Sequence, residues 1–549
     1  DTSRPPRNGA TMKTRCAFAA GHPLTVAAGA EVLAAGGSAV DAVVAGAAMA
    51  MVAEPVLAGP YGGGFLMLAE GGRVRCLDAF VDTPARRRPD GETDLRTITA
   101  DFGTSTQRFH IGAASIAVSG LMVALAGAQG DAGRMPLGDL VQPAVRAARE
   151  GVAITAFQAR LGRVVAPILT ASPASSALNT DADGAPLAEG ARRRNPDLGD
   201  VLEVFGIEGP DLLVRGEVAQ ALAAQAAEGG HLVLDDLARW RPVYRTPLRA
   251  SRAGVRLSLT PPPAIGGALT ALPLALMPPS AGTPARLARA FALTLMARGA
   301  SGIDADAATG AARLAETGLQ GALAGALAGP AGGWWAAARA AAARGRATRG
   351  TTHLSAIDRT GAAASLTLSN GEGCGLIVPG TGIMANNMLG EEDLVPPGPD
   401  GEPGDWPPGQ RLASMMTPAI MDWPDGRRAA LGSGGSARIR TAMAQVMLRL
   451  VDGTAPGRLP DLGAAIEAPR LHVDTAEDGA AVDLDYERDG LAEEAERALL
   501  DDWPRDVGAV RPWETRSMFY GGVHAVTAGP DGSAAAAGDP RRGGDAWTG

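Results

Sequence analysis

The pattern of apolar residues changes at Thr351, and this change constrains the fold more than any other feature of the chain. Residues 135–350 are rich in helical patterns and include a long alanine-rich run. The next segment, TTHLSAIDRTGAAASLTLSN, predicts a strand, a turn at Asp-Arg-Thr-Gly and a second strand. Between them, 341–350 is basic and contains glycine, which favours an exposed linker. We therefore expect a mostly helical region, 1–350, with strands near its start, and a strand-rich region, 351–549.

The start of the chain predicts helices that cover a sheet. Polar, irregular sequence is expected over the first 22 residues, followed by a helix in PLTVAAGAEVLAAGG that ends at Gly36-Gly37. Ser38 is a suitable N-cap for a second helix, AVDAVVAGAAMAMVA, which ends at Glu54-Pro55. PYGGGFLMLAE and RVRCLDAFV then predict two strands. The expected fold class is therefore α+β.

Composition excludes several classes of function. The net charge of −9 argues against a nucleic-acid partner, which usually requires a basic surface. Three cysteines without CxxC spacing and six histidines without an HxxxH pair predict neither a metal site nor a cofactor site. The apolar stretch Val40–Ala53 contains Asp41 and is too short to cross a membrane. Since no signal peptide is recognisable, we expect a cytoplasmic protein, or a periplasmic one if a leader was removed before Asp1.

The junction itself allows a specific chemistry. A threonine at a chain terminus can use its own α-amine as a base, because that amine has a pKa of roughly 7.7–8.0. Thr351 would gain a free amine only if the bond after Gly350 were cut. Its hydroxyl could attack the preceding carbonyl, which a glycine leaves uncrowded. By itself, Gly-Thr-Thr-His is more typical of the start of an ordinary strand.

Several further blocks, in one order along the chain, resemble the γ-glutamyltransferase family. They are GHPLTVAAGAEVLAAGGSAVDAVVAGAAMAMVAEPVLAGPYGGGFLML, DDLARWRPVYRTPL, PPPAIGGALTALPL, TTHLSAIDRTGAAASLT, PGTGIMANNML, LASMMTP, LGSGGSARI and VHAVTAGPDGSAAAAGDPRRGG. The resemblance implies an N-terminal-nucleophile hydrolase with a four-layer αββα sandwich. It also implies self-cleavage at 350/351 into a large and a small fragment that together form one composite domain.

The resemblance assigns a catalytic role to four positions. Thr351 would be the nucleophile, and its freed amine the general base. Ser369, or alternatively Thr367, would orient that amine. Gly435 and Ser436 would supply backbone N–H groups as an oxyanion hole, although the family usually has a second glycine where Ser436 stands. The phosphate-loop alternative for GSGGS lacks the required GxxxxGK[ST] lysine.

The substrate-binding positions depart from the family. Ser414 matches the first serine of the substrate loop, but Met415 replaces the second. Phe80 stands in the place of an arginine that would bind the α-carboxylate of a γ-glutamyl group, and Met388 replaces a glutamine. Phenylalanine and methionine cannot pair with a carboxylate. Only Glu391, in an acidic stretch, could still meet the α-ammonium of such a substrate.

These observations leave three readings open. The first is a self-processing amidohydrolase or acyltransferase whose small-molecule amide substrate is not a standard γ-glutamyl compound. The second is a conventional γ-glutamyl hydrolase or transpeptidase that acts on glutathione-like donors. The third is a catalytically silent scaffold. A homo-oligomer is compatible with each of them.

Overall fold

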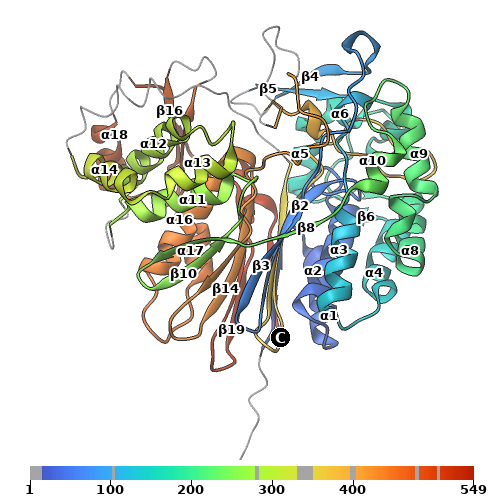
Figure 1. Cartoon of the computed structure of the whole chain (residues 1–549). Helices are drawn as coiled ribbons and strands as arrows, with labels where there is room; N and C mark the ends of the chain where they lie inside the picture. Colours follow the sequence, from blue (N-terminus) through green and yellow to red (C-terminus); the bar gives the residue numbers. More distant parts are fainter. Residues whose placement is uncertain are drawn as a thin grey trace, which may run out of the picture.

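Two antiparallel sheets, each built from both sides of residue 350, form the centre of the molecule (Figure 1). The computed structural model describes residues 15–101, 106–278, 283–329, 350–392, 394–395, 404–476, 481–503 and 507–549. The first sheet has the order β20 (Asp545–Thr548), β1 (Ala17–Ala20), β11 (Thr352–Ile357), β12 (Ala363–Ser369), β2 (Gly63–Glu70), β3 (Arg73–Ala79) and β8 (Val243–Arg245). The second has the order β19 (Ala534–Ala537), β18 (Gly522–Ala528), β14 (Arg428–Gly434), β13 (Ala419–Asp422), β10 (Val255–Leu259) and β9 (Leu248–Arg252).

Helices lie on the outer side of each sheet (Figure 1). On the side of the first sheet are α1 (Pro23–Ala34), α2 (Ala39–Ala53), α3 (Leu121–Ala132), α4 (Leu137–Glu150), α5 (Ala156–Val164), α6 (Ala166–Leu169), α7 (Pro173–Asn179), α8 (Pro196–Glu208), α9 (Glu217–Ala226) and α10 (Leu234–Arg239). On the side of the second are α11 (Gly266–Leu276), α12 (Pro284–Ser301), α13 (Ala307–Leu314), α14 (Thr317–Ala328), α16 (Ile439–Asp452), α17 (Leu462–Glu467) and α18 (Glu493–Asp502).

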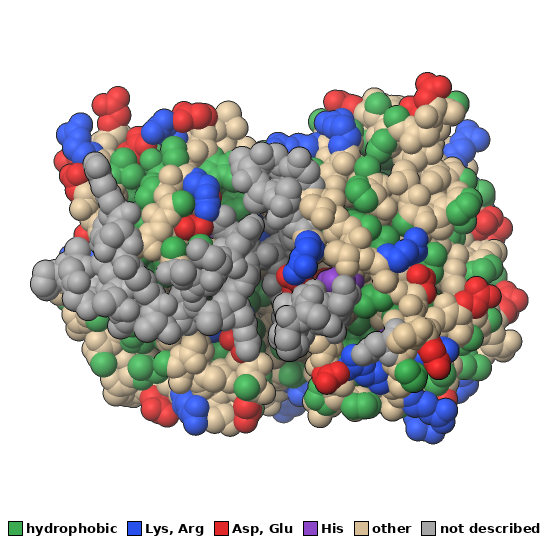
Figure 2. All heavy atoms as spheres, turned by 90° about the horizontal axis from the view of Figure 1, so that it is seen from above, with side chains coloured by type: hydrophobic (Ala, Val, Ile, Leu, Met, Phe, Trp, Pro, Cys, Tyr) green, Lys and Arg blue, Asp and Glu red, His purple; other side chains and the backbone are tan. Residues whose placement is uncertain are grey.

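Smaller sheets complete the fold. They are β15 (Leu471–Thr475), β16 (Val482–Glu487) and β17 (Val510–Trp513), then β4 (Arg96–Asp101) with β5 (Thr106–Ile111), and β6 (Val152–Ala153) with β7 (Arg192–Arg193). Basic and acidic side chains are interspersed over the described part of the face shown in Figure 2. Within the described ranges, no helix is both long and apolar enough to cross a membrane.

Alternation along β11 explains how the first sheet can be buried on both faces. Leu354 and Ala356 belong to the core beneath the helices of the first sheet, together with Leu366 of β12. The residues between them face the second sheet, where the Ser355 hydroxyl lies 3.4 Å from the His524 carbonyl. A second core fills the space under α11, α12 and α16, and a third, smaller one joins the two sheets.

Most of the predicted elements are confirmed. The first two helices are α1 and α2, and Ser38 caps α2 in a capping box with Asp41. The strand pair after Thr351 is β11 and β12, paired from Thr352 opposite Leu368 to Ile357 opposite Ala363. The sequence pattern therefore predicted the first two helices and the strand pair after Thr351 correctly.

One prediction about local structure was wrong. The irregular start contains β1, a four-residue apolar strand that is fully buried and too short for its alternation to be recognised. The region 135–350 is mostly helical over its described residues and also contains the hairpin β9–β10, which turns at Gly254.

Candidate active site

The peptide bond between Gly350 and Thr351 lies in the interior, at the point where the chain enters β11. Thr351 is 3% exposed, and Gly350 is also buried. The Ser369 hydroxyl donates a hydrogen bond to the Gly350 carbonyl. On the other side, the Gly350 N–H donates to Oε1 of Glu372 at 2.6 Å. The prediction of an exposed linker is therefore wrong at Gly350, and residues 341–349 lie outside the described residues.

The surroundings of Gly350 explain why a glycine precedes the threonine. A Cβ atom placed on it would lie 2.6 Å from the Gly371 carbonyl oxygen and 3.0 Å from that of Val56. Backbone oxygens cannot move aside as a flexible side chain can. The site thus holds Gly350 between two polar side chains, in a space that has no room for a side chain of its own.

The loop after β14 approaches the same peptide from the second sheet. A Cβ on Gly434 would lie 2.1 Å from the Thr351 carbonyl oxygen, so only glycine allows this close approach. Gly435 follows with φ of 125°, and Ser436 has φ of 56°. The left-handed conformation of Ser436 is one that glycine favours. The turn is therefore retained even though a serine stands where the family usually has glycine.

His353 is close to the junction but engaged elsewhere. Its Nδ1 lies 2.8 Å from the Thr367 hydroxyl, and its Nε2 lies 2.8 Å from the Ser355 hydroxyl. Burial, and then the nearby His524, hold the pKa of His353 well below its ordinary value. Two hydroxyls were considered for orienting the Thr351 amine. The Thr367 hydroxyl contacts His353, whereas the Ser369 hydroxyl contacts the Gly350 carbonyl at the junction.

A buried carboxyl group supports the residue after the candidate nucleophile. Glu54, at the end of α2, accepts hydrogen bonds from the hydroxyls of Thr352 at 2.8 Å and Thr25 at 3.0 Å. Burial raises the pKa of Glu54 to about 7, although both hydrogen bonds act in the opposite direction. Glu54 thus links α2 to the first residue of β11.

The predicted site residues gather around one pocket. With the exception of Gly435, which is adjacent in the chain to Ser436, all of them line it. The polar wall consists of Thr351, Ser369, Glu391, Ser414 and Ser436, and the apolar wall of Phe80, Met388, Leu394, Met415, Met416 and Ile439.

The apolar wall is held in place by packing. The Phe80 ring stacks on Phe65, with 5.5 Å between the ring centroids and 20° between the planes. Phe80 and Met388 are each 1% exposed, whereas Met415 is only partly buried. At the polar edge of this wall, the Ser414 hydroxyl accepts a hydrogen bond from the Met416 N–H at 3.1 Å. The pocket therefore presents apolar surface at Phe80, the position for which the resemblance implied an arginine.

Sequence reasoning missed six residues at or near this site, and one of them is Glu54, described above. Glu372 and Arg542 are bonded to the junction, the latter through Nη1, which lies 3.4 Å from the Thr351 carbonyl oxygen. Glu372 follows Ser369 by three positions in a glycine-rich turn, and this proximity was the available signal. The others line the pocket: Leu394, Met416 and Ile439.

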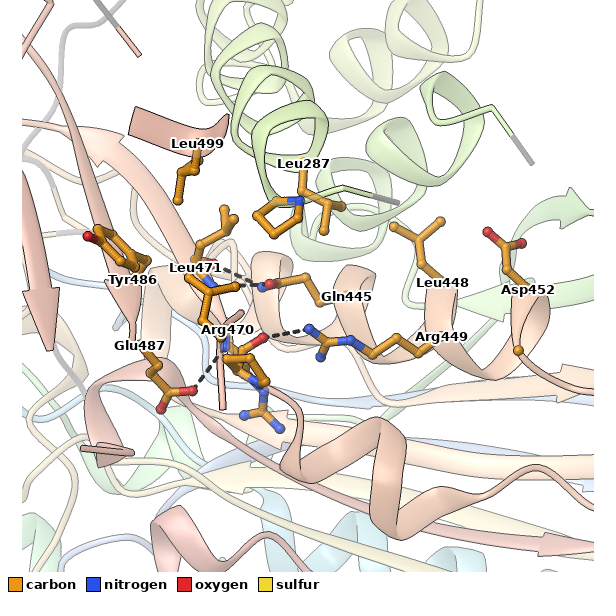
Figure 3. A pocket seen from close by; sticks show the side chains of 14 residues that line it. Leu287, Gln445, Leu448, Arg449, Asp452, Arg470, Leu471, Tyr486, Glu487 and Leu499 are labelled. Carbon is orange, nitrogen blue, oxygen red and sulfur yellow. Dashed lines mark hydrogen bonds between the residues drawn. The ribbon is translucent and has the colours of Figure 1, made fainter. Parts of the chain in front are cut away.

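A larger cavity lies elsewhere, between α12, α16 and the strands β15 and β16 (Figure 3). Its polar side chains are used within the protein, since Gln445 donates to the Leu471 carbonyl and Arg449 to the Pro469 carbonyl. None of the predicted site residues lines it. Among the described residues, no three His, Cys, Asp or Glu side chains gather in a way that could hold a metal ion.

Comparison with known proteins identifies the family. The profile described as Gamma-glutamyltranspeptidase matches residues 25–549. The Acylase ACY 1 proenzyme of Pseudomonas sp. (strain V22) is 29% identical over 529 residues, which cover 93% of this chain and 89% of that protein. The Glutathione hydrolase proenzyme of Bacillus subtilis (strain 168) is 26% identical over 520 residues, covering 86% and 84%.

A solved structure supports the same fold. The cephalosporin acylase from Bacillus halodurans superimposes with a TM-score of 0.78 and 21% identity, covering 100% of this chain and 98% of that one. The family match extends over both sheets and includes every residue of the pocket described above. The chain therefore belongs to the γ-glutamyltranspeptidase family of hydrolases and transferases, whose relatives here include both acylases and glutathione hydrolases.

Proposed function

We propose that the chain is the precursor of an amidohydrolase that cuts itself between Gly350 and Thr351 and then uses Thr351 as its nucleophile. The observation that carries the proposal is the arrangement at Gly350, whose carbonyl accepts from Ser369 and whose N–H donates to Glu372. Both groups act on the residue before the bond to be cut. An ordinary strand start would not require such a buried polar enclosure.

Self-cleavage would proceed by transfer of the Gly350 acyl group. The Thr351 hydroxyl attacks the Gly350 carbonyl carbon, and the C–N bond then breaks to leave an ester and a free α-amine. Water hydrolyses the ester, which gives a Gly350 carboxylate and restores the hydroxyl. The Ser369 hydroxyl, already bonded to the Gly350 oxygen, would stabilise the negative charge that develops there.

Turnover would use the same atoms on a substrate. The freed amine takes the hydroxyl proton, Thr351 attacks the amide carbonyl, and the amine group of the substrate leaves with that proton. Backbone N–H groups of Gly435 and Ser436 would bind the oxyanion, and water or a second amine would then release the acyl group. His353 is not required, because both of its ring nitrogens already contact hydroxyls.

The proposed acyl donor has an apolar or neutral end. Phe80, Met388 and Met415 line the pocket at the positions where the family binds a carboxylate, and a carboxylate left without a partner there would cost several kcal/mol, on the order of 3. The acylase relatives are compatible with a donor outside the γ-glutamyl class. The glutathione hydrolase relatives and the retained Glu391 favour the second candidate, a conventional γ-glutamyl hydrolase or transpeptidase.

The arrangement of helices outside two facing sheets supports assignment to the four-layer αββα sandwich of N-terminal-nucleophile hydrolases. The relatives named proenzymes support a precursor whose two fragments stay together.

A catalytically silent scaffold would not require the hydrogen bonds that enclose Gly350 at the junction. The cytoplasmic location and a possible homo-oligomer stay predictions.

Self-cleavage is the decisive test. On denaturing gels the wild-type chain should separate into two fragments, and the smaller should begin Thr-Thr-His-Leu-Ser. Thr351→Ala should run as one full-length band and lack amidase activity. Thr352→Ala, a neighbouring hydroxyl bonded to Glu54, serves as the matched control and should still be cleaved. Soluble, folded wild-type protein that stays full-length after long incubation contradicts the proposal.

A further inference from the structure

A buried arginine from the C-terminal end of the chain contacts the junction. Arg542 ends the short helix Pro540–Arg542 and is 4% exposed. Its Nη1 donates to the Thr351 carbonyl oxygen at 3.4 Å, and its Nε donates to the Met518 carbonyl oxygen at 3.3 Å. The side-chain carbons pack on Gly522, where an added Cβ would lie 2.8 Å from the Arg542 Cβ. Packing and two hydrogen bonds therefore fix the guanidinium beside Thr351.

No carboxylate neutralises the charge of this guanidinium directly. Within the part of the chain that the structure describes, Arg542 forms no ion pair. Asp539, the nearest carboxylate in the sequence, is bonded to Arg470 at 2.6 Å and to Arg541 at 3.3 Å. Burial lowers the pKa of Arg542 only to about 10, so its side chain stays charged in the range where an α-amine titrates.

The contact is to the residue whose amine would act as the base. The nitrogen and the carbonyl oxygen of one residue are less than about 4 Å apart, which places the freed amine within about 7 Å of the Arg542 Nη1. Glu372 is bonded instead to Gly350, on the other side of the bond to be cut. Cleavage would therefore remove the partner of Glu372 and leave that of Arg542 in place. A fixed positive charge at this range disfavours protonation of an amine.

Other charged or titratable groups surround the junction. They are Glu54, His353, Glu372, Glu391, Arg438 and His524. Burial holds the pKa of His353 well below its ordinary value and lowers that of His524 to about 4, so both rings are neutral at pH 7. Arg438 adds to the positive charge, and carboxylates at Glu372 and Glu391 act against it. Glu54 has a pKa of about 7 and titrates in the same range as an α-amine.

We propose that Arg542 is a positioning residue that keeps the freed Thr351 amine unprotonated near neutral pH. This inference rests on the proposed function, because it concerns the amine that self-cleavage would release. Arg542 acts through its charge and through its hold on the Thr351 carbonyl, and it exchanges no proton itself. An amine that is neutral at a lower pH can accept the hydroxyl proton over a wider pH range.

The test is the pH dependence of kcat/KM for hexanoyl-p-nitroanilide, measured on cleaved protein between about pH 5 and 10. The wild-type rate should rise with pH around a midpoint below the ordinary α-amine pKa of roughly 7.7. Arg542→Gln removes the charge and should raise that midpoint by about one pH unit. Activity at about pH 6 should then fall about tenfold, whereas activity at about pH 10 should approach that of wild type.

Two further variants separate charge from packing. Arg542→Lys keeps the charge and should keep the wild-type midpoint. Arg449→Gln is the matched control, because Arg449 also donates to two backbone carbonyls and forms no ion pair with any residue that the structure describes. It lies at the larger cavity, away from Thr351 (Figure 3), and its loss should leave the midpoint unchanged.

Three results would overturn the proposal: an unchanged midpoint in Arg542→Gln, an equal loss of rate at every pH, or the same shift in Arg449→Gln. The shift should also persist in a Glu54→Gln background, and its loss there would assign it to Glu54. Should Arg542→Gln fail to fold or to be cleaved, a wild-type midpoint above about 8 or a raised midpoint in Arg542→Lys still contradicts the proposal. Failure of the proposed function looks different, as an uncleaved wild-type chain or an active Thr351→Ala variant.

Discussion

The surroundings of the Thr351 pocket comprise two groups of residues with different chemistry, which we call the junction wall and the acyl wall. The junction wall, formed by Gly350, Thr351, Ser369 and the 435–436 turn, is polar and held by hydrogen bonds and close backbone approaches. The acyl wall, formed by Phe80, Met388 and Met415, is apolar and held by packing. Under the proposed function, the junction wall would carry the chemistry and the acyl wall would recognise the acyl donor.

Physical constraints explain how the two walls could diverge. The junction wall is fixed by backbone oxygens and glycines, so almost any change there creates an overlap or an unpaired polar group. The acyl wall consists of side chains, of which Phe80 and Met388 are buried and Met415 is partly exposed. Phe80 rests on Phe65, and a side-chain contact of this kind can change without moving the backbone at Thr351.

The largest expected effect is at the junction wall. Gly350→Ala places a Cβ 2.6 Å from the Gly371 oxygen, so the peptide must shift away from Ser369 and Glu372. We expect self-cleavage to slow at least about a hundredfold, which corresponds to about 3 kcal/mol in the barrier. The measurement is the fraction of full-length protein on denaturing gels over time.

The control for this variant is Gly318→Ala in α14, where an added Cβ meets no atom within 4 Å. That variant should be cleaved at the wild-type rate. If Gly350→Ala is cleaved equally fast, the enclosure of Gly350 has no part in cleavage, and the distinction between the two walls loses its main support.

Glu54, which lies beside the junction wall, allows a test of whether ionisation of a buried carboxyl group lowers the stability of the folded protein. The folded protein holds its pKa at about 7, above the ordinary 4.5, so this group stabilises the fold below pH 4.5 and loses that contribution as pH rises through 7. Glu54→Gln cannot ionise. At about pH 8 we expect it to be more stable than wild type by on the order of 3 kcal/mol.

Urea unfolding at several pH values measures this difference. The advantage of Glu54→Gln should shrink as pH falls and disappear below the ordinary pKa of 4.5. Asp531→Asn is a suitable control, since Asp531 is an exposed carboxylate whose pKa is lowered by Ser533. A pH-independent difference would show that Glu54 acts through packing alone.

The acyl wall predicts which donor is preferred. Hexanoyl-p-nitroanilide should be hydrolysed with a kcat/KM at least about tenfold above that of γ-glutamyl-p-nitroanilide, because each buried methylene contributes about 0.8 kcal/mol. The two substrates share a leaving group, so the ratio reports the acyl end. A γ-glutamyl substrate that is hydrolysed more efficiently would favour the conventional reading.

A double variant sharpens the same comparison. F80R with M415S restores the arginine and serine that the family resemblance implies, and should raise γ-glutamyl hydrolysis relative to hexanoyl hydrolysis. The gain should be modest, since an arginine at 80 would lie against Phe65 in a packed core. Both rates should be normalised to the amount of cleaved protein.

The sequence allowed prediction of the features that depend on local pattern. The strand pair after Thr351 and the capped helix at Ser38 follow from alternation and capping. The positions around the pocket came from the family resemblance, because residues as distant in the chain as Phe80 and Ser436 meet only in the folded protein.

Other features could not be predicted because tertiary contacts determine them. The strand β1 is only four residues long, and its place between β20 and β11 depends on both chain ends. Nothing in the sequence marks Glu54 as a neighbour of the junction, since it lies at an otherwise ordinary helix end, and Glu372 is marked only by its position three residues after Ser369. Gly350 was expected in an exposed linker because its glycine and basic neighbours are typical of one.

The smallest expected effect concerns Ser436, where the junction wall departs from the family. Its φ of 56° costs a serine about 1 kcal/mol, and glycine avoids that cost but gains freedom in the unfolded chain. Ser436→Gly should therefore leave the free energy of unfolding within about 1 kcal/mol of wild type and keep amidase activity.

Gly435→Ala is the contrasting variant. Gly435 has φ of 125°, and a Cβ added there would lie 2.8 Å from the Gly521 Cα. It should lose both stability and activity. If Ser436→Gly abolishes activity while it folds and is cleaved normally, the serine hydroxyl itself contacts the reacting groups, and the junction wall has diverged in chemistry as well.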